Sequence, residues 1–171
     1  AVREGDVYVL NGSKAWATQG PAGDLFVVMA RTGGPGAKGV SAFLVESEYE
    51  GVSFGKPEDK MGMRASPTSI INLDNVRVPA DNLLAEEGMG FVIAMMALDS
   101  GRITIGASAV GLAQAALDES VQYSKEREAF GRPIGDHQGV GFMLADMAIE
   151  IESSRLMVMQ AAGLRDQGKP Y

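Results

Sequence analysis

The stretch that decides the fold reads Arg127-Glu128-Ala129-Phe130-Gly131-Arg132-Pro133-Ile134-Gly135-Asp136-His137-Gln138, and it separates two long segments with apolar residues at helical spacing. No proline interrupts the chain from Met89 to Arg132, which predicts one long helix or two nearly collinear ones. A second helix is expected from about Asp136, on an apolar stripe formed by Val140, Met143, Leu144, Met147, Ile151 and Val158. Two such helices cannot close a bundle alone, so we expect partner helices from another subunit or from further chain.

The part of the chain before the helices, residues 1–84, predicts β structure. Short apolar runs are cut by Gly, Pro, Asn and Asp, and Asn11-Gly12 predicts a hairpin turn between strands at 7–10 and 13–18. Further strands are expected at residues 25–31, 40–46, 52–55, 68–73 and 76–78. Short strands at this spacing indicate an antiparallel β-sandwich or barrel-like domain. The predicted fold class is therefore α+β, with this domain followed by long helices of an incomplete bundle.

Composition excludes several classes of function. The net charge of -7, without any basic run, argues against nucleic acid as a partner. The chain has no cysteine and one histidine, which excludes disulfides, thiolate metal sites and histidine-cluster metal sites. No uninterrupted apolar run approaches about 18 residues, so we expect no membrane span. The N-terminus does not resemble a signal peptide and reads as the middle of a longer protein. We therefore expect a soluble intracellular protein, cytoplasmic or, in a eukaryote, of the mitochondrial matrix.

The connecting stretch also carries chemistry. Arg127 supplies a planar cation suited to phosphate, and Phe130 supplies a flat apolar face. Gln138 carries both hydrogen-bond donors and acceptors, which suits a base edge. Together these residues suggest a site for a phosphorylated ligand with an aromatic head. The alternative is a polar helix–helix turn whose phenylalanine plugs the core, with His137 an ordinary residue at a helix N-terminus.

A colinear set of blocks carries a family resemblance. The blocks are Asn11-Gly12-Ser13-Lys14-Ala15-Trp16-Ala17-Thr18, Lys60-Met61-Gly62-Met63-Arg64-Ala65-Ser66-Pro67-Thr68, Val76-Arg77-Val78-Pro79, Gly88-Met89-Gly90-Phe91, Leu98-Asp99-Ser100-Gly101-Arg102 and the stretch from Arg127 to Gln138. In order and spacing they resemble an internal fragment of an acyl-CoA dehydrogenase. The resemblance implies that residues 1–84 are most of the middle β domain, which contacts flavin and substrate. Residues 85–171 would be the first helices of the C-terminal helical bundle domain, so the resemblance implies long antiparallel helices of a four-helix bundle that is incomplete in this chain.

The resemblance also implies a cofactor, FAD, and residues that bind it. Trp16 and Thr18 match the flavin-contacting strand, where an indole can cover a flavin face and a hydroxyl can bond a ring heteroatom. The alternative for this pair is a core tryptophan beside an exposed threonine. The residues Arg127, Phe130, His137 and Gln138 match the segment that reaches the pyrophosphate and adenosine end of FAD from a neighbouring subunit.

For the substrate, the resemblance places Asp99 and Arg102 beside the acyl-CoA. Without it, the same pair reads as an intrahelical salt bridge. Lys60, Arg64 and Ser66 would form a loop near the outer end of the substrate, with a mostly structural role.

The implied activity is oxidation of an acyl-CoA thioester to the trans-2-enoyl-CoA, by α-proton abstraction and β-hydride transfer to flavin. The resemblance places the catalytic base of most family members, a glutamate on a later loop, beyond this chain, and the helix position used in some branches is Gly101 here, which cannot accept a proton. We therefore expect this chain alone to be inactive. Expected partners are an electron-transfer flavoprotein and further copies of the chain in a homodimer or homotetramer. Alternatives are a related flavin oxidase or monooxygenase, or a non-catalytic assembly or nucleic-acid-binding member of the same scaffold.

Overall fold

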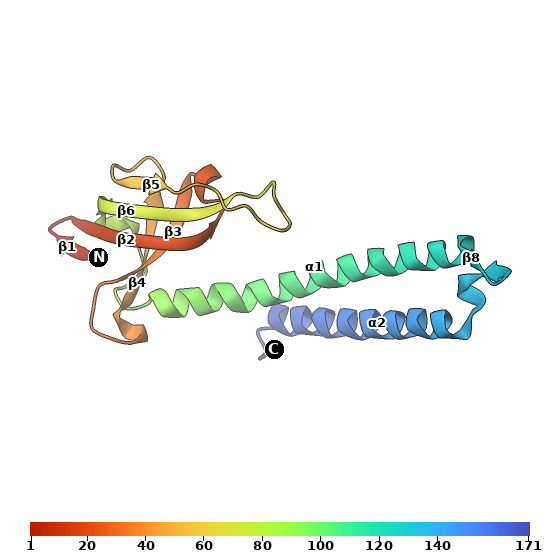
Figure 1. Cartoon of the computed structure of the whole chain (residues 1–171). Coiled ribbons are helices and arrows are strands. Elements are labelled where there is room, and N and C mark those ends of the chain that lie inside the picture. The colour runs from red at the N-terminus through yellow and green to blue at the C-terminus, as the bar shows by residue number, and fades with distance from the viewer. The chain divides into compact units, whose positions relative to one another are not determined.

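The computed structural model describes all 171 residues, Ala1–Tyr171. Antiparallel sheets are followed by two long helices, so the predicted α+β class is confirmed (Figure 1). The chain divides into two compact units, Ala1–Met96 and Ala97–Tyr171. The division falls inside the first long helix because its first turns pack on the β unit. The amide of Gly88 donates to the hydroxyl of Ser41, at 2.9 Å.

Two antiparallel sheets build the first unit. The larger sheet has the order β1-β2-β6-β5, with β1 at Val2–Glu4, β2 at Val7–Thr18, β5 at Val52–Phe54 and β6 at Thr68–Pro79. The smaller has the order β3-β4-β7, with β3 at Leu25–Arg31, β4 at Val40–Glu46 and β7 at Leu83–Leu84. The short 3-10 helices η1, η2 and η3 lie at Gly20–Ala22, Ala37–Gly39 and Ala80–Asn82. β3 and β4 run as predicted.

The core of this unit consists of side chains from both sheets, as expected for a sandwich. Tyr8 and Phe43 come from different sheets, and their ring centroids are 4.9 Å apart. Alternate residues are buried in Val7–Leu10 of β2 and on either side of Asp74 and Asn75 in β6, as a period of two requires. The buried cluster is Tyr8, Leu10, Val28, Phe43, Val45, Ile71, Leu73, Val76 and Val78.

The hairpin predicted at Asn11-Gly12 is wrong. β2 continues through both residues and pairs with β6, with a register shift between Leu10 and Gly12. Asn75 has a φ of 53° there, and its amide donates to Asn11 Oδ1 at 2.8 Å. The bulge lies on β6, where Asp74 and Asn75 together oppose Asn11, and the Asn11 side chain accepts the hydrogen bond of the Asn75 amide. The two strands predicted at 68–73 and 76–78 are therefore one strand, β6, which continues through this bulge.

The second unit contains a helical hairpin. α1 spans Gly90–Glu126 as a single helix, and α2 spans Gln138–Asp166. Between them lie β8 (Glu128–Ala129), β9 (Arg132–Pro133) and the 3-10 helix η4 (Ile134–Asp136). α2 therefore begins two residues after the predicted start at about Asp136.

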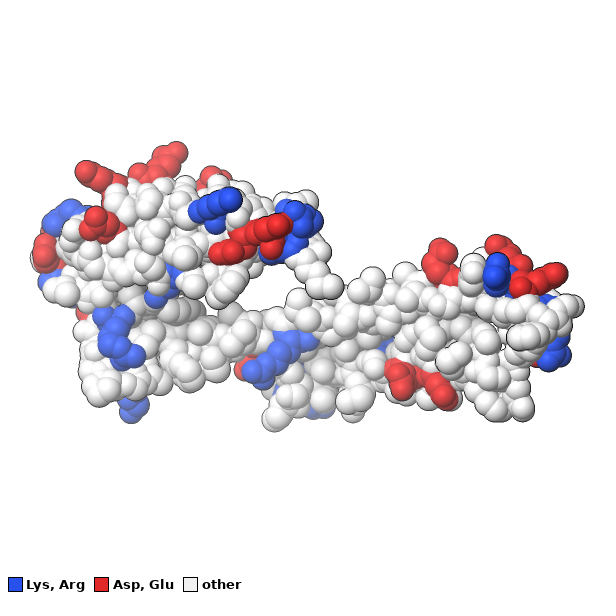
Figure 2. All heavy atoms as spheres, viewed as in Figure 1, with Lys and Arg blue, Asp and Glu red and all other residues white.

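Few side chains of the helical unit are buried. Its core is Val110, Leu117 and Ile151, so α1 is covered along one side only. Figure 2 shows that charges gather near the α1–α2 connection, while much of the remaining visible helix surface is uncharged. By length and composition alone, α1 is apolar enough to cross a membrane, against the expectation of no span. This is weak evidence, because a core helix of a soluble bundle has the same composition.

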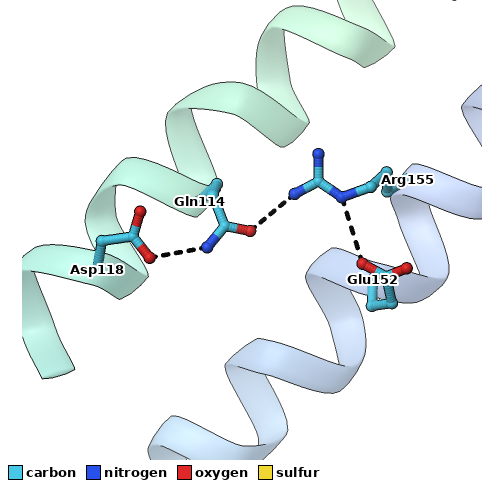
Figure 3. A network of polar contacts seen from close by, with 4 residues as sticks. All are labelled: Gln114, Asp118, Glu152 and Arg155. Atoms are coloured by element: carbon cyan, nitrogen blue, oxygen red, sulfur yellow. Dashed lines mark hydrogen bonds and ion pairs between the residues drawn. The ribbon is translucent and has the colours of Figure 1, made fainter.

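A polar network joins the two helices (Figure 3). Arg155 on α2 donates to Gln114 Oε1 on α1, at 2.7 Å. Gln114 in turn donates to Asp118, at 2.8 Å, and Arg155 Nε lies 3.3 Å from Glu152. The network therefore links apolar helix faces at one defined position.

Candidate functional site

Trp16 sits at a β-bulge that turns it away from the core. Lys14 pairs with Ile71 and Ala17 pairs with Ser69, so Ala15 and Trp16 together oppose one residue of β6. Trp16 adopts a φ of 59°, which is strained for a tryptophan. Its side chain is 72% exposed, which shows that it is not a core residue. A large apolar ring held in solvent by a strained backbone is suited to covering a flat ligand.

Thr18 lies two residues further along, at the end of β2, where it pairs with Thr68. Ala17 packs against the core, so the exposed side chains of Trp16 and Thr18 belong to the outer side of the sheet. The structure therefore places these two predicted residues together at one end of β2.

The loop 60–66 is held close to this end of the strand. Lys60 Nζ donates to the carbonyl of Met63 at 2.9 Å and also to that of Ser66. Gln19 Nε2 donates to Ser66 Oγ at 3.0 Å. Arg64 pairs with Asp59 at 2.5 Å, but both are exposed. These contacts fold the loop on itself, as a structural role requires.

A two-residue turn presents Phe130 at the α1–α2 connection. Phe130 and Gly131 have φ values of 54° and 79°, both positive as in a type I′ turn between β8 and β9. The Phe130 side chain is 96% exposed, so the alternative that it plugs the core is wrong. Arg127 precedes the turn, is exposed, and its guanidinium makes no hydrogen bond or ion pair within the chain. A free cation and a free ring therefore stand on one short connection.

His137 and Gln138 have different surroundings. The backbone of His137 caps α2, but its ring turns back, with Nε2 3.0 Å from the carbonyl oxygen of Ala129. Its Nδ1 lies 3.1 Å from a guanidinium nitrogen of Arg132. Gln138 is the first residue of α2 and its side chain is exposed. Arg132 was missed as a candidate, although its place five residues before the only histidine was a usable signal.

Asp99 and Arg102 form the intrahelical pair that their spacing allows, with a separation of 3.7 Å. Both are more than half exposed, so the pair contributes little to stability. They lie on a groove of about 540 Å³ between α1 and the end of α2, whose lining also includes Ile103, Met157, Val158, Ala161, Pro170 and Tyr171. Roughly 36 Å of helix separates Arg102 from Glu126, at about 1.5 Å per residue. The structure therefore does not bring this pair together with the Arg127 group.

No carboxylate is placed as a general base beside this pair. Gly101, between Asp99 and Arg102, has no side chain to accept a proton. Glu87, near the start of α1, accepts a hydrogen bond from the buried Tyr8 hydroxyl. This hydrogen bond, together with burial, raises the pKa of Tyr8 above its ordinary value. Glu87 is thus occupied in anchoring the start of the helix to the β unit.

Comparison with known proteins places the chain in a family. Residues 1–76 match the family model for the acyl-CoA dehydrogenase middle domain, and residues 88–171 match that for the C-terminal domain. The short-chain specific acyl-CoA dehydrogenase of Clostridium acetobutylicum is 48% identical over 172 aligned residues. That alignment covers 100% of this chain and 45% of the relative.

Solved structures agree with the sequence matches. Butyryl-CoA dehydrogenase of Megasphaera elsdenii superimposes with a TM-score of 0.96 at 46% identity, over 99% of this chain and 45% of that one. A chain in the structure of the electron transferring flavoprotein of Acidaminococcus fermentans gives a TM-score of 0.95 at 50% identity, with the same coverages. The chain thus spans less than half the length of these relatives. It belongs to the acyl-CoA dehydrogenase family.

Proposed function

We propose that this chain forms the flavin- and substrate-contacting part of an acyl-CoA dehydrogenase that oxidises a short-chain acyl-CoA to the trans-2-enoyl-CoA. The whole-chain similarity to the short-chain enzyme of Clostridium acetobutylicum and to butyryl-CoA dehydrogenase supports the reaction and the substrate class. Residues 1–84 are the middle β domain in this proposal, and residues 85–171 begin the helical bundle domain.

The residues described above fit FAD. Trp16 offers an exposed indole on a strained bulge, and Thr18 offers a hydroxyl beside it. Arg127 offers an unpaired guanidinium for the pyrophosphate, and Phe130 offers an exposed ring for the adenosine end. Held by these residues, FAD would supply the acceptor for the hydride of the substrate β carbon.

Other residues of this chain position the substrate. Asp99 and Arg102 orient the acyl-CoA along the groove between the helices. The base that takes the α proton is supplied by residues outside this chain, because Gly101 and the occupied Glu87 cannot serve. The electron acceptor is an electron-transfer flavoprotein, and the exposed apolar helix faces are covered in a homodimer or homotetramer.

The similarity to short-chain enzymes carries this proposal, and the exposed indole of Trp16 supplies one part of its test. In the longer protein expected to contain this chain, bound FAD should give flavin absorption bands and quench the part of the tryptophan fluorescence that Trp16→Phe removes. Anaerobic addition of butyryl-CoA should bleach those bands, and a long-chain acyl-CoA should bleach them less. A yellow protein that no acyl-CoA bleaches would indicate a flavin oxidase, a monooxygenase or a non-catalytic member. Unquenched Trp16 fluorescence in the flavin-loaded protein would contradict the assigned contact.

A further inference from the structure

The turn that carries Phe130 is strained and must be held by its neighbours. A left-handed conformation suits glycine or asparagine, and it costs about 1 kcal/mol or more for a bulky residue. Phe130 receives no compensation from burial, because its side chain is 96% exposed. Such a conformation persists only where surrounding contacts over-determine it. Besides the backbone pairing of β8 with β9, the side-chain contacts with this turn come from one residue, His137.

His137 contacts the turn at three points. Its Nε2 lies 3.0 Å from the carbonyl oxygen of Ala129, just before the turn. Its Nδ1 lies 3.1 Å from the guanidinium of Arg132, just after it. Its ring meets that of Phe130 edge to face, with centroids 6.0 Å apart and planes at 87°. One imidazole therefore bridges both strands of the hairpin and touches the ring at its tip.

The partners of the imidazole determine its tautomer. A carbonyl oxygen can only accept, so Nε2 must carry the proton that it shares with Ala129. A guanidinium can only donate, so Nδ1 must present its lone pair to Arg132. Only the neutral tautomer with a proton on Nε2 satisfies both contacts. In the opposite tautomer, the lone pair of Nε2 would face the carbonyl oxygen of Ala129, and the proton on Nδ1 would face an N–H group of Arg132.

The same residue is also the N-cap of α2. The carbonyl of His137 accepts hydrogen bonds from the amides of Val140 at 2.9 Å and Gly141 at 3.1 Å. Its side chain is therefore attached to a helix end that is fixed by its own backbone. The position of the hairpin therefore depends on the position of the start of α2.

We infer that His137 is a positioning residue, which holds the Ala129–Arg132 hairpin through its Nε2–H tautomer and so sets Phe130 for the cofactor. This inference rests on the proposed FAD site, and it reassigns His137 from contacting the cofactor to supporting a residue that contacts it. Arg132 becomes part of the same brace.

Because the chain has one histidine, its tautomer can be read without ambiguity. The chain would be labelled with 15N-histidine, purified without a histidine tag, and studied by two-dimensional 1H–15N correlation at a pH where the ring is neutral. We expect a single Nε2–H pattern, which should become a mixture in Arg132→Met and persist in Arg132→Lys. An Nδ1–H pattern, or averaged nitrogens in the unmodified chain, would overturn the inference.

The consequence for the cofactor is measured in the longer, flavin-loaded protein. His137→Phe keeps a ring but loses both hydrogen bonds, and it should weaken FAD binding roughly tenfold. His137→Gln restores a donor near Ala129 and should recover part of that loss. Unchanged FAD affinity in both variants, with the expected tautomer, would also overturn the inference. A longer protein that binds no FAD would refute the proposed function and, with it, the positioning role of His137. The tautomer measurement needs no flavin, so it tests the contacts of His137 with the hairpin independently of the proposed function.

Discussion

The guanidinium of Arg155 on α2 donates a hydrogen bond of 2.7 Å to the amide oxygen of Gln114 on α1. This contact is partly buried among apolar helix faces, where an unsatisfied polar atom costs free energy. It fixes the register of α1 against α2, because their apolar surfaces alone would allow one helix to slide along the other. The ion pair of Arg155 with Glu152 lies on one helix and is largely exposed, so it adds little.

Arg155→Met should therefore lower the free energy of unfolding by about 1–3 kcal/mol, because Gln114 loses its partner. Urea unfolding of this chain followed by circular dichroism would measure the loss. The matched control is Arg165→Met, near the end of the same helix, which should change stability by less than about 0.5 kcal/mol. The double variant with Gln114→Leu should recover most of the loss. Additive effects of the two substitutions would contradict the pairing.

The hydrogen bond from Tyr8 to Glu87 predicts a dependence of stability on pH. It raises the pKa of Tyr8 in the folded chain, so the native state keeps the phenol proton to higher pH than the unfolded state does. The stabilisation is complete below a pH of about 10 and is lost as the pH rises above it.

Urea unfolding between pH 8 and 11 would therefore show a steeper loss of stability in the unmodified chain than in Tyr8→Phe. Tyr123→Phe, at an exposed tyrosine of α1, is the control and should keep the steep slope. Equal slopes in the unmodified chain and Tyr8→Phe would show that the hydrogen bond does not persist in solution.

Where hydrophobic period and turn chemistry agree, the sequence was sufficient to predict the structure. β3 and β4 follow a continuous apolar pattern between clear breakers, and their bounds are the predicted ones. Asn11-Gly12 was misleading because β2 continues through this pair, where Asn11 lies opposite a bulge of Asp74 and Asn75 in β6, and only this long-range pairing decides between a strand and a turn.

Prediction of the candidate site from the sequence was limited in a similar way. The residue types at Arg127 and Phe130 suggested a ligand, but the backbone strain at Phe130 and Trp16 has no signature in either residue type. The bond from His137 to Ala129 involves a main-chain carbonyl, which every residue possesses. Such a contact cannot be predicted from side-chain chemistry, so the role of His137 became visible only in the structure.

The close packing of Gly90 against the main chain predicts that even a substitution by alanine lowers the stability of the chain. A Cβ atom added there would lie 2.6 Å from the carbonyl carbon of Ser41 and 2.7 Å from its oxygen, which are main-chain atoms. Gly90→Ala should therefore lower the free energy of unfolding by about 1–3 kcal/mol, despite the better helix propensity of alanine. Gly111→Ala, in the same helix with nothing within 4 Å of the added atom, should raise it by about 0.5–1 kcal/mol. Thermal unfolding of both variants would test this, and a stabilised Gly90→Ala would contradict the close packing.

Trp16 allows stability and cofactor binding to be separated. Trp16→Gly relieves a positive φ and removes a side chain that is mostly exposed, so this chain should gain roughly 1 kcal/mol of stability. The same substitution in the longer protein should weaken FAD binding, because the indole is proposed to cover the flavin. Thermal unfolding and FAD titration would measure the two effects. Loss of both properties would mean that Trp16 serves the fold instead.

Arg127→Ala should weaken retention of FAD more than it slows the chemical step. The guanidinium has no partner within the chain, so its removal should leave the stability of the chain within about 0.5 kcal/mol. An arginine that meets a pyrophosphate contributes charge-assisted hydrogen bonds, and losing them should raise the Kd for FAD by roughly tenfold or more.

Lys125→Ala removes the same charge two residues earlier and serves as the control, with little expected effect on FAD. Absorbance at the flavin band before and after dialysis reports retention, and stopped-flow bleaching in excess FAD reports the chemical step. Full flavin occupancy of Arg127→Ala after dialysis would show that this cation binds something other than the cofactor.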